Sequence, residues 1–181
     1  MIALVLGGAR SGKSGYAASV ARALSPSPVL LATSRPYDAD HAARIARHRA
    51  DRGPEWTTVE EETKIARTDL GGRVVVIDCV TLWLTNLFLD GGEDGAATLA
   101  IARAELGRLA EIEACWIFVS NELGMAPHAA TEMGRRFVDL QGLVNQAIGA
   151  RAVAVSLMVA GIPLAVKGGD LLAALRGDAG R

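Results

Sequence analysis

Eight residues near the N-terminus have the types and spacing of a phosphate-binding loop. Residues 7–14 read GGARSGKS and match the pattern G-x-x-x-x-G-K-[ST] in full. Glycines let the backbone curl so that its N–H groups point at phosphate oxygens, and the start of the following helix adds partial positive charge. We therefore expect nucleotide phosphates to bind at Gly7, Gly8, Ala9, Arg10, Ser11, Gly12, Lys13 and Ser14.

Three side chains complete the chemistry of such a loop. The ammonium of Lys13 can reach the β- and γ-phosphates, and the hydroxyl of Ser14 can bind Mg²⁺. A nucleotide-bound Mg²⁺ also needs an acidic group at a strand end, and Asp78 follows apolar residues in the stretch VVVIDC. We predict that Ser14 and Asp78 serve the metal. The alternative is that Asp78 caps the next helix.

A basic stretch carries histidines that could act on a nucleotide. Residues 38–51 alternate Ala and Arg, and at about 100° per residue one side of a helix there would carry His41, Arg44, Ile45, His48 and Arg52. Arginine forks bind phosphate oxygens, and a neutral imidazole is a competent nucleophile near neutral pH. The alternative is a solvent-exposed basic helix with no role in chemistry.

Alternating strand and helix patterns place these groups in an α/β fold. Apolar runs typical of strands occur at 2–6, 29–33, 74–78, 116–120, 152–158 and 162–166. Helical patterns occur at 14–24, 38–51, 81–89, 96–113 and 132–150. Because the strands are almost continuously apolar, we expect a mostly parallel sheet covered by helices on both faces. The last two strands, joined by a tight turn, are expected to form an antiparallel pair at its edge.

Length, charge and cysteine usage restrict the class of protein. The chain has 181 residues, and we predict one domain over 1–167 followed by a C-terminal tail over 168–181. A net charge of −1 argues against nucleic-acid binding through a basic surface. The longest uncharged stretch, 152–166, is shorter than the roughly 20 residues of a membrane span. The two cysteines lack metal-site spacing, which fits buried free thiols in a cytoplasmic protein.

An ordered series of short motifs resembles a known enzyme family. After GGARSGKS come ATS at 32–34, AARIARHRADRGPEW at 42–56, IDCVTLWLTNL at 77–87, SNELGM at 120–125, RRFVDLQGLVNQ at 135–146 and VSLMVAGIPLAVK at 155–167. The series covers about residues 1–167 and is similar to the bifunctional adenosylcobinamide kinase/adenosylcobinamide-phosphate guanylyltransferases of cobalamin biosynthesis. The loop alone is generic, whereas the ordered set is specific.

The resemblance implies two reactions. The first is phosphorylation of the aminopropanol hydroxyl of adenosylcobinamide by ATP or GTP. The second is transfer of GMP from GTP to that phosphate, with release of pyrophosphate, through a GMP–histidine intermediate. The family histidine follows the Ile of the A-R-I motif by three residues and corresponds to His48. His48 and Lys13 are therefore the expected catalytic residues.

The resemblance also implies further nucleotide contacts and an assembly. By position, the family's contacts outside the loop fall on Thr33, Ser34, Arg35, Arg49, Ala50, Asp51, Arg52, Glu60 and Asp78. Glu60 begins a run of three glutamates that could instead be a solvated face. The family further implies a RecA-like arrangement of strands and a homotrimer.

The chain departs from the family pattern at two places, and two other functions stay open. The stretch MAPHA at 125–129 replaces a Gly-Ile-Val-Pro segment, and position 78 carries Asp rather than Glu. One alternative function is a P-loop small-molecule kinase in which His48 does nothing covalent. The other is a nucleotide-binding regulatory module whose basic helix contacts an acidic partner.

Overall fold

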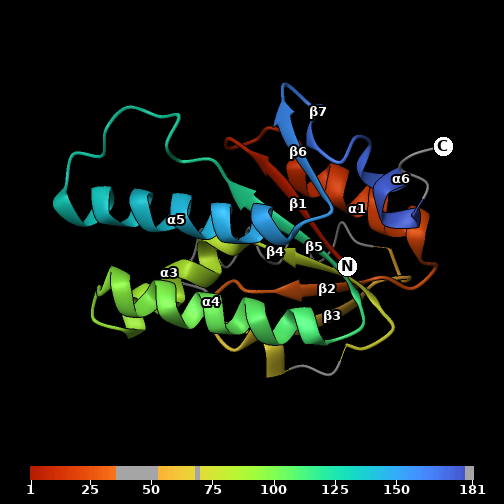
Figure 1. Cartoon of the computed structure of the whole chain (residues 1–181), viewed down its shortest axis with the longest axis horizontal. Helices are drawn as coiled ribbons and strands as arrows, with labels where there is room; N and C mark the ends of the chain where they lie inside the picture. Colours follow the sequence, from red (N-terminus) through yellow and green to blue (C-terminus); the bar gives the residue numbers. More distant parts are fainter. Residues whose placement is uncertain (36–52, 68–69, 178–181) are drawn as a thin grey trace.

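A seven-stranded sheet lies between two layers of helices (Figure 1). The computed structural model describes residues 1–35, 53–67 and 70–177. The strands are β1 (Ile2–Gly7), β2 (Val29–Ala32), β3 (Thr57–Glu60), β4 (Val74–Asp78), β5 (Cys115–Asn121), β6 (Ala154–Val159) and β7 (Ile162–Lys167). The helices are α1 (Lys13–Leu24), α3 (Val80–Asp90), α4 (Gly95–Glu111), α5 (Glu132–Arg151) and α6 (Leu171–Arg176), with a 3-10 helix η1 (Ile65–Arg67).

The order of the strands confirms the predicted fold class. The sheet runs β3-β2-β4-β5-β1-β6-β7, and neighbouring strands pair in parallel except β6 and β7, which are antiparallel. The antiparallel pair therefore forms one edge, as the sequence predicted. A single strand, β5, separates β1 from β4. This separation is the RecA-like arrangement that the family resemblance implied.

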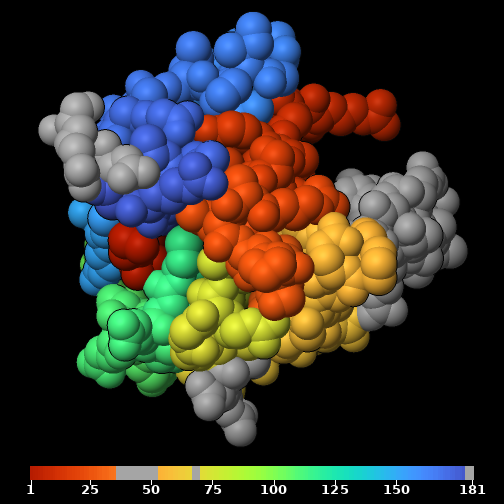
Figure 2. Space-filling view, turned by 90° about the vertical axis from the view of Figure 1, so that its right-hand side faces the viewer, coloured from red at the N-terminus to blue at the C-terminus, as the bar shows by residue number. Residues whose placement is uncertain are grey.

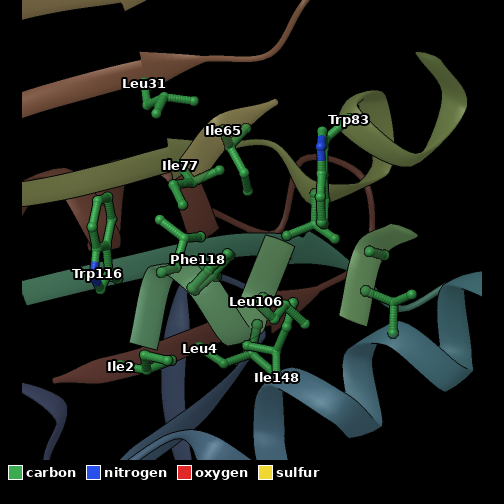
Figure 3. Close-up of a cluster of buried hydrophobic side chains, with 14 of the residues drawn as sticks. Ile2, Leu4, Leu31, Ile65, Ile77, Trp83, Leu106, Trp116, Phe118 and Ile148 are labelled. Carbon is green, nitrogen blue, oxygen red and sulfur yellow. The ribbon is translucent and has the colours of Figure 1, made fainter. Parts of the chain in front are cut away.

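Side chains of the central strands alternate between two apolar layers. Ile2 and Leu4 pack with α3, α4 and α5 on one face, whereas Ala3 and Val5 pack with α1 and α6 on the other. Figure 3 shows the first of these layers, where large buried side chains from the sheet meet those of the helices. Burial on both faces explains why these strands read as continuous apolar runs.

Most predicted elements have their ends within two residues of the observed ones. One strand was missed: β3 has three exposed residues among four and no apolar run. It pairs in parallel with β2 at the edge of the sheet. Within the segment predicted as a tail, Leu171 and Leu175 of α6 are buried beside Val20 of α1. The helix predicted at 38–51 lies outside the described residues.

Candidate nucleotide site

The carboxyl ends of five parallel strands meet at one edge of the sheet and bring predicted site residues together. In the strand register, Gly7 of β1 lies beside Asn121 of β5. On the other side of β5, Asp78 of β4 lies beside Ala32 of β2, which pairs in turn with Glu60 of β3. Because neighbouring strands are about 4.8 Å apart, β1 and β4 are separated by about 10 Å. The loop after β1 and the carboxylate of β4 therefore lie at the same edge.

Glycines shape the loop between β1 and α1. Gly12 has a φ of +93°, a left-handed conformation that residues with a side chain rarely adopt, and it immediately precedes α1. Gly7 lies close to its neighbours, because an added Cβ would lie 2.4 Å from the Ser11 hydroxyl oxygen and 3.0 Å from the backbone carbonyl oxygen of Met158. That hydroxyl is buried and has no hydrogen-bond partner among the described residues. The observed loop therefore requires glycine at both positions.

The ammonium of Lys13 folds back over this loop. Its Nζ donates to the Gly8 carbonyl oxygen at 2.9 Å, and the residue is only 9 % exposed. Ser14 follows in the first turn of α1 and is half-buried. The turn between β6 and β7 supports the loop, since the Gly161 N–H donates to the Ser11 carbonyl oxygen at 3.1 Å. A buried cation thus lies in a loop that is packed against the sheet.

Asp78 is the last residue of β4, and its carboxylate and the Lys13 ammonium both act on the pKa of the Cys79 thiol. Burial raises the pKa of the Cys79 thiol to about 11, the negative charge of Asp78 adds to this rise, and Lys13 opposes it. Hydroxyl and carboxylate oxygens suit Mg²⁺, which is usually held by one or two carboxylates together with nucleotide phosphates. Ser14 and Asp78 fit that donor set. Within the described ranges no group of three or more His, Cys, Asp or Glu side chains could hold a metal ion.

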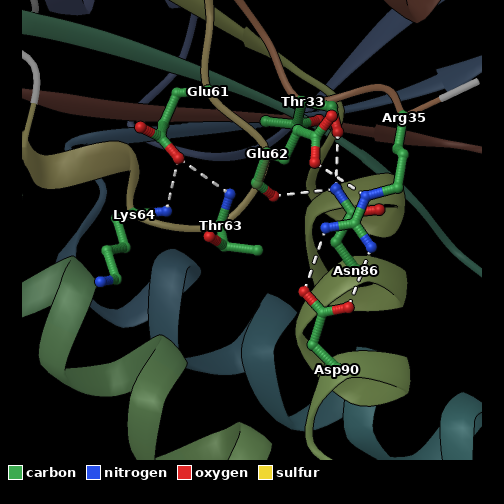
Figure 4. A network of polar contacts seen from close by, with 8 residues as sticks. All are labelled: Thr33, Arg35, Glu61, Glu62, Thr63, Lys64, Asn86 and Asp90. Atoms are coloured by element: carbon green, nitrogen blue, oxygen red, sulfur yellow. Dashed lines mark hydrogen bonds and ion pairs between the residues drawn. The ribbon is translucent and has the colours of Figure 1, made fainter.

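Thr33 is completely buried and bonds to the backbone that follows Asp78. Its hydroxyl donates to the Cys79 carbonyl oxygen at 2.8 Å and accepts from the Cys79 N–H at 3.0 Å. Asn86 of α3, also buried, donates from Nδ2 to the carbonyl oxygens of Thr33 and Glu62 at 2.8 Å each (Figure 4). Thr33 therefore belongs to the framework of the site, and its side chain is not part of the exposed surface.

The guanidinium of Arg35 is held by two carboxylates (Figure 4). Its Nε donates to Glu62 at 2.7 Å, and its two Nη atoms donate to Asp90 at 2.9 and 3.0 Å. The hydrogen bonds to Asp90 and Glu62 raise the pKa of Arg35, and Arg35 lowers the pKa of the Asp90 carboxyl. Asp90 is the last residue of α3, about 15 Å along the helix axis from its first residue, Val80. Arg35 thus points toward the end of α3 that is remote from Asp78.

The three glutamates at 60–62 have different roles. Glu60 ends β3 with an exposed side chain. Glu61 accepts hydrogen bonds from the backbone N–H groups of Thr63 at 3.1 Å and Lys64 at 2.9 Å, which closes a turn. Glu62 pairs with Arg35 at 2.7 Å. The run is therefore not a uniform solvated face, because two of its carboxylates organise the chain beside the site.

The predicted residues of the basic stretch lie outside the described residues: His41, His48, Arg49, Ala50, Asp51 and Arg52. Just after that stretch, Glu55 pairs with Arg22 of α1 at 2.8 Å, and the Arg22 guanidinium lies 5.5 Å from the centre of the Trp56 ring. Figure 2 shows α1 in red-orange between α6 in blue and the amber segment that contains Glu55 and Trp56. These contacts hold the segment just before β3 against α1, the helix that follows the glycine-rich loop.

Buried amides that sequence reasoning missed surround the end of β5. The Ser120 hydroxyl donates to Asn145 Oδ1 at 2.6 Å, and Gln141 Nε2 donates to the Ser120 hydroxyl at 2.9 Å. Asn145 Nδ2 donates to the Asn121 carbonyl oxygen at 3.1 Å, and Asn121 Nδ2 donates to Thr81 Oγ1 at 2.8 Å. The sequence did contain a signal for these amides. Gln141 and Asn145 stand at positions of α5 whose helical spacing places them on the buried face, where apolar residues are usual.

Comparison with known proteins decides the family. A family model described as cobinamide kinase / cobinamide phosphate guanyltransferase matches residues 3–166. The chain belongs to this family. The bifunctional adenosylcobalamin biosynthesis protein CobP of Pseudomonas aeruginosa is 40% identical over 172 residues, which cover 93% of this chain and 98% of that protein. The bifunctional proteins named CobU of Escherichia coli and Salmonella typhimurium are 37% and 35% identical, over 92% of this chain and all of theirs.

Membership of the cobinamide kinase / cobinamide phosphate guanyltransferase family confirms the resemblance seen in the sequence motifs. The matched region contains the P-loop and Asp78, and it extends into β7. The chain is therefore a transferase of a nucleotide-using family with a P-loop α/β fold.

Proposed function

We propose that this chain phosphorylates adenosylcobinamide with ATP or GTP and then transfers GMP from GTP to adenosylcobinamide phosphate at the same nucleotide site. The observation that carries the proposal is the glycine-shaped loop with the buried Lys13 ammonium, one strand away from Asp78. The description of the matched family contains both activities. The curated relatives are named as bifunctional proteins, which supports two reactions in one chain.

In the kinase reaction, the aminopropanol hydroxyl oxygen attacks the γ-phosphorus, the bond from this phosphorus to the β–γ bridging oxygen breaks, a nucleoside diphosphate leaves, and the hydroxyl proton passes to solvent. The loop backbone and the Lys13 ammonium bind the β- and γ-phosphates and stabilise the negative charge that develops on them. Ser14 and Asp78 would hold Mg²⁺, which neutralises phosphate charge when it is bound. Lys13 at the start of α1 and Asp78 at the end of β4 are in place before the nucleotide arrives, so little reorganisation is needed at the moment of reaction.

In the guanylyl transfer, we assign the nucleophile to His48. An imidazole nitrogen attacks the α-phosphorus of GTP, the bond from this phosphorus to the bridging oxygen breaks, and pyrophosphate leaves. A phosphate oxygen of adenosylcobinamide phosphate then attacks the same phosphorus, which breaks the N–P bond and releases the imidazole. The groups that bind the β- and γ-phosphates stabilise the leaving pyrophosphate. The resemblance supports further nucleotide contacts at Ser34, Arg35, Arg49, Ala50, Asp51, Arg52 and Glu60 as parts of this proposal.

Incubation of the full chain with α-³²P GTP and no acceptor tests this assignment. The wild-type protein should retain an acid-labile, alkali-stable label, as an N–P bond does. His48→Ala should abolish the label, whereas His41→Ala, a control in the same basic stretch, should retain it. A label retained in His48→Ala would place the nucleophile elsewhere. An unlabelled wild type that still phosphorylates cobinamide would favour the plain kinase, and loss of both would favour the regulatory module.

We further propose that three copies of the chain assemble through the edge of the sheet at β7. Every residue of β7 is exposed, and Ile162, Leu164 and Val166 expose 62, 49 and 62 % of their surface. Proteins normally cover an exposed apolar edge strand, because its unpaired backbone groups and side chains promote association. Light scattering in solution should give the mass of three chains. A monomer at micromolar concentration would contradict the proposal.

We assign the protein to the cytoplasm. Cys79 and Cys115 are both free thiols, which fits a reducing compartment. The described part of the chain contains no helix that is long and apolar enough to cross a membrane. Fractionation of cells that express the protein should recover it with cytoplasmic enzymes, and recovery with membranes or with secreted protein would contradict the assignment.

A further inference from the structure

Three hydrogen bonds attach Thr33 to the backbone on either side of the Asp78–Cys79 peptide bond. The Thr33 hydroxyl donates to the Cys79 carbonyl oxygen at 2.8 Å and accepts from the Cys79 N–H at 3.0 Å. The Thr33 N–H donates to the Asp78 carbonyl oxygen at 3.4 Å. Strands β2 and β4 pair as far as Ala32 and Asp78, so these bonds begin where the strand pairing ends. Thr33 therefore extends the hydrogen bonding between β2 and β4 by one residue beyond Asp78.

Asn86 fixes Thr33 from the opposite side. Its Nδ2 donates to the Thr33 carbonyl oxygen and to the Glu62 carbonyl oxygen, both at 2.8 Å (Figure 4). Asn86 lies in α3, which begins at Val80, so the helix that holds Thr33 continues directly from the chain that leaves Asp78. These links form a closed ring. The chain runs from Asp78 and Cys79 along α3 to Asn86, Asn86 bonds to Thr33, and Thr33 bonds back to Cys79.

Burial makes this ring rigid. Thr33 and Asn86 are both 0 % exposed, so water does not compete for their hydrogen bonds. A buried donor or acceptor that loses its partner carries the full cost of desolvation. The hydroxyl of Thr33 is already engaged as donor and as acceptor by Cys79. Its side chain therefore acts on the backbone of the site.

We propose that Thr33 and Asn86 are positioning residues that set where the Asp78 carboxylate meets the nucleotide-bound metal. The inference rests on the proposed function, which assigns Mg²⁺ to Asp78. Mg²⁺ demands near-ideal octahedral geometry at short distances, so a small displacement of the carboxylate weakens its binding. Residues that hold metal ligands in place typically change metal affinity by about 10–100-fold.

Binding of Mn²⁺ tests the proposal without reference to turnover. The probe is Mn²⁺ added to the full chain with a non-hydrolysable GTP analogue, guanylyl imidodiphosphate, and the free ion is measured by electron paramagnetic resonance. Thr33→Val keeps the shape of the side chain and removes the hydroxyl, whereas Thr33→Ser keeps the hydroxyl. We expect Thr33→Val to weaken Mn²⁺ binding about tenfold and Thr33→Ser to remain close to wild type. Wild-type affinity in Thr33→Val would overturn the proposal.

A double-mutant cycle separates this inference from the proposed function. If Thr33 acts through Asp78, Thr33→Val should add no further loss of Mn²⁺ affinity to Asp78→Asn. Equal losses from Thr33→Val in both backgrounds would overturn the positioning role. Wild-type Mn²⁺ affinity in Asp78→Asn would instead overturn the assignment of the metal to Asp78. Binding of the analogue without metal should be unchanged in Thr33→Val, since a loss there would indicate direct contact with the nucleotide.

Asn86→Ala supplies the same test from α3 if Thr33→Val does not fold. The variant releases the Thr33 carbonyl oxygen and should weaken Mn²⁺ binding while metal-free binding of the analogue persists. Thr85→Ala is the matched control, because among the described residues the Thr85 hydroxyl bonds within α3, to the Thr81 carbonyl oxygen at 2.9 Å. Equal Mn²⁺ affinity in Asn86→Ala and Thr85→Ala would overturn the proposal.

Discussion

The two halves of the nucleotide site are held in place by different means. On the β1 side, glycine backbone and the bond from Lys13 to the Gly8 carbonyl shape the loop, and all of these groups lie within eight consecutive residues. On the β4 side, Asp78 depends on Thr33 at the end of β2 and on Asn86 in α3. The phosphate half is therefore built mainly from one continuous stretch, which the turn between β6 and β7 supports, whereas the metal half is assembled by the order of the strands.

The largest expected effect lies in the local half. Lys13→Ala removes the ammonium that binds the β- and γ-phosphates, so the rates of both half-reactions should fall by about 10³-fold. Separate assays of cobinamide phosphorylation and guanylyl transfer measure the two losses. Lys64→Ala, which changes an exposed residue, should leave both rates unchanged. Unimpaired guanylyl transfer in Lys13→Ala would mean that the two reactions use separate nucleotide sites.

An intermediate effect is expected from the loop backbone. Gly12→Ala places a side chain at a φ of +93° and 3.4 Å from the Gly161 Cα. A left-handed conformation costs roughly 1–2 kcal/mol. The variant loop therefore relaxes to another conformation in the free protein and has to return to the observed one on binding, which lowers nucleotide affinity by about tenfold. Isothermal titration calorimetry measures this loss.

Gly15→Ala is the control for that prediction. A Cβ on Gly15, inside α1, would meet no atom of the described residues within 4 Å. The substitution should stabilise the protein by about 0.5–1 kcal/mol and leave nucleotide affinity unchanged. Equal affinity in Gly12→Ala and Gly15→Ala would show that the loop conformation does not determine phosphate binding.

The predictability of the fold follows from the same contrast between local and assembled structure. The strand at 74–78 could be predicted residue for residue, because an apolar run buried on both faces ends at a carboxylate. The strand at 57–60 could not, because its residues are mostly exposed and its pairing with β2 is a tertiary contact. Short polar edge strands carry no apolar pattern of their own.

The candidate site divides in the same way. The loop at 7–14 could be found from spacing alone, and the edge location of Asp78 followed from the end of its apolar run. The resemblance assigned Thr33 to the nucleotide, but the structure buries its side chain against Cys79. A motif fixes the residue type at a position and does not specify which way the side chain faces. The role of His48 stays a prediction.

The smallest expected effect concerns the outer ion pair on the metal side. Arg35 lowers the pKa of the Asp90 carboxyl. Because the folded-state pKa is depressed, the pair stabilises the protein above the unfolded pKa, and this contribution is lost as the pH falls through the folded value. The side chains of Arg35 and Asp90 are 32% and 50% exposed, so solvent screens the pair and the effect is small.

Urea unfolding of Asp90→Asn checks that prediction. The variant should unfold at slightly lower urea concentration than wild type near neutral pH, and the two midpoints should converge below the ordinary carboxyl pKa of about 3.9. A difference that persists or grows at acidic pH would show that the ion pair is not its cause. Identical midpoints near neutral pH would show that the pair contributes nothing measurable.

We propose that one nucleotide site serves both reactions, with His48 as the residue that carries GMP between them. Peptide mapping by mass spectrometry under alkaline conditions tests it most directly, after incubation of the full chain with GTP and Mg²⁺ but no acceptor. We expect GMP on the peptide that contains His48, and we expect it to disappear when adenosylcobinamide phosphate is added. GMP bound to a different residue, or a covalent GMP that the acceptor does not remove, would contradict this role of His48.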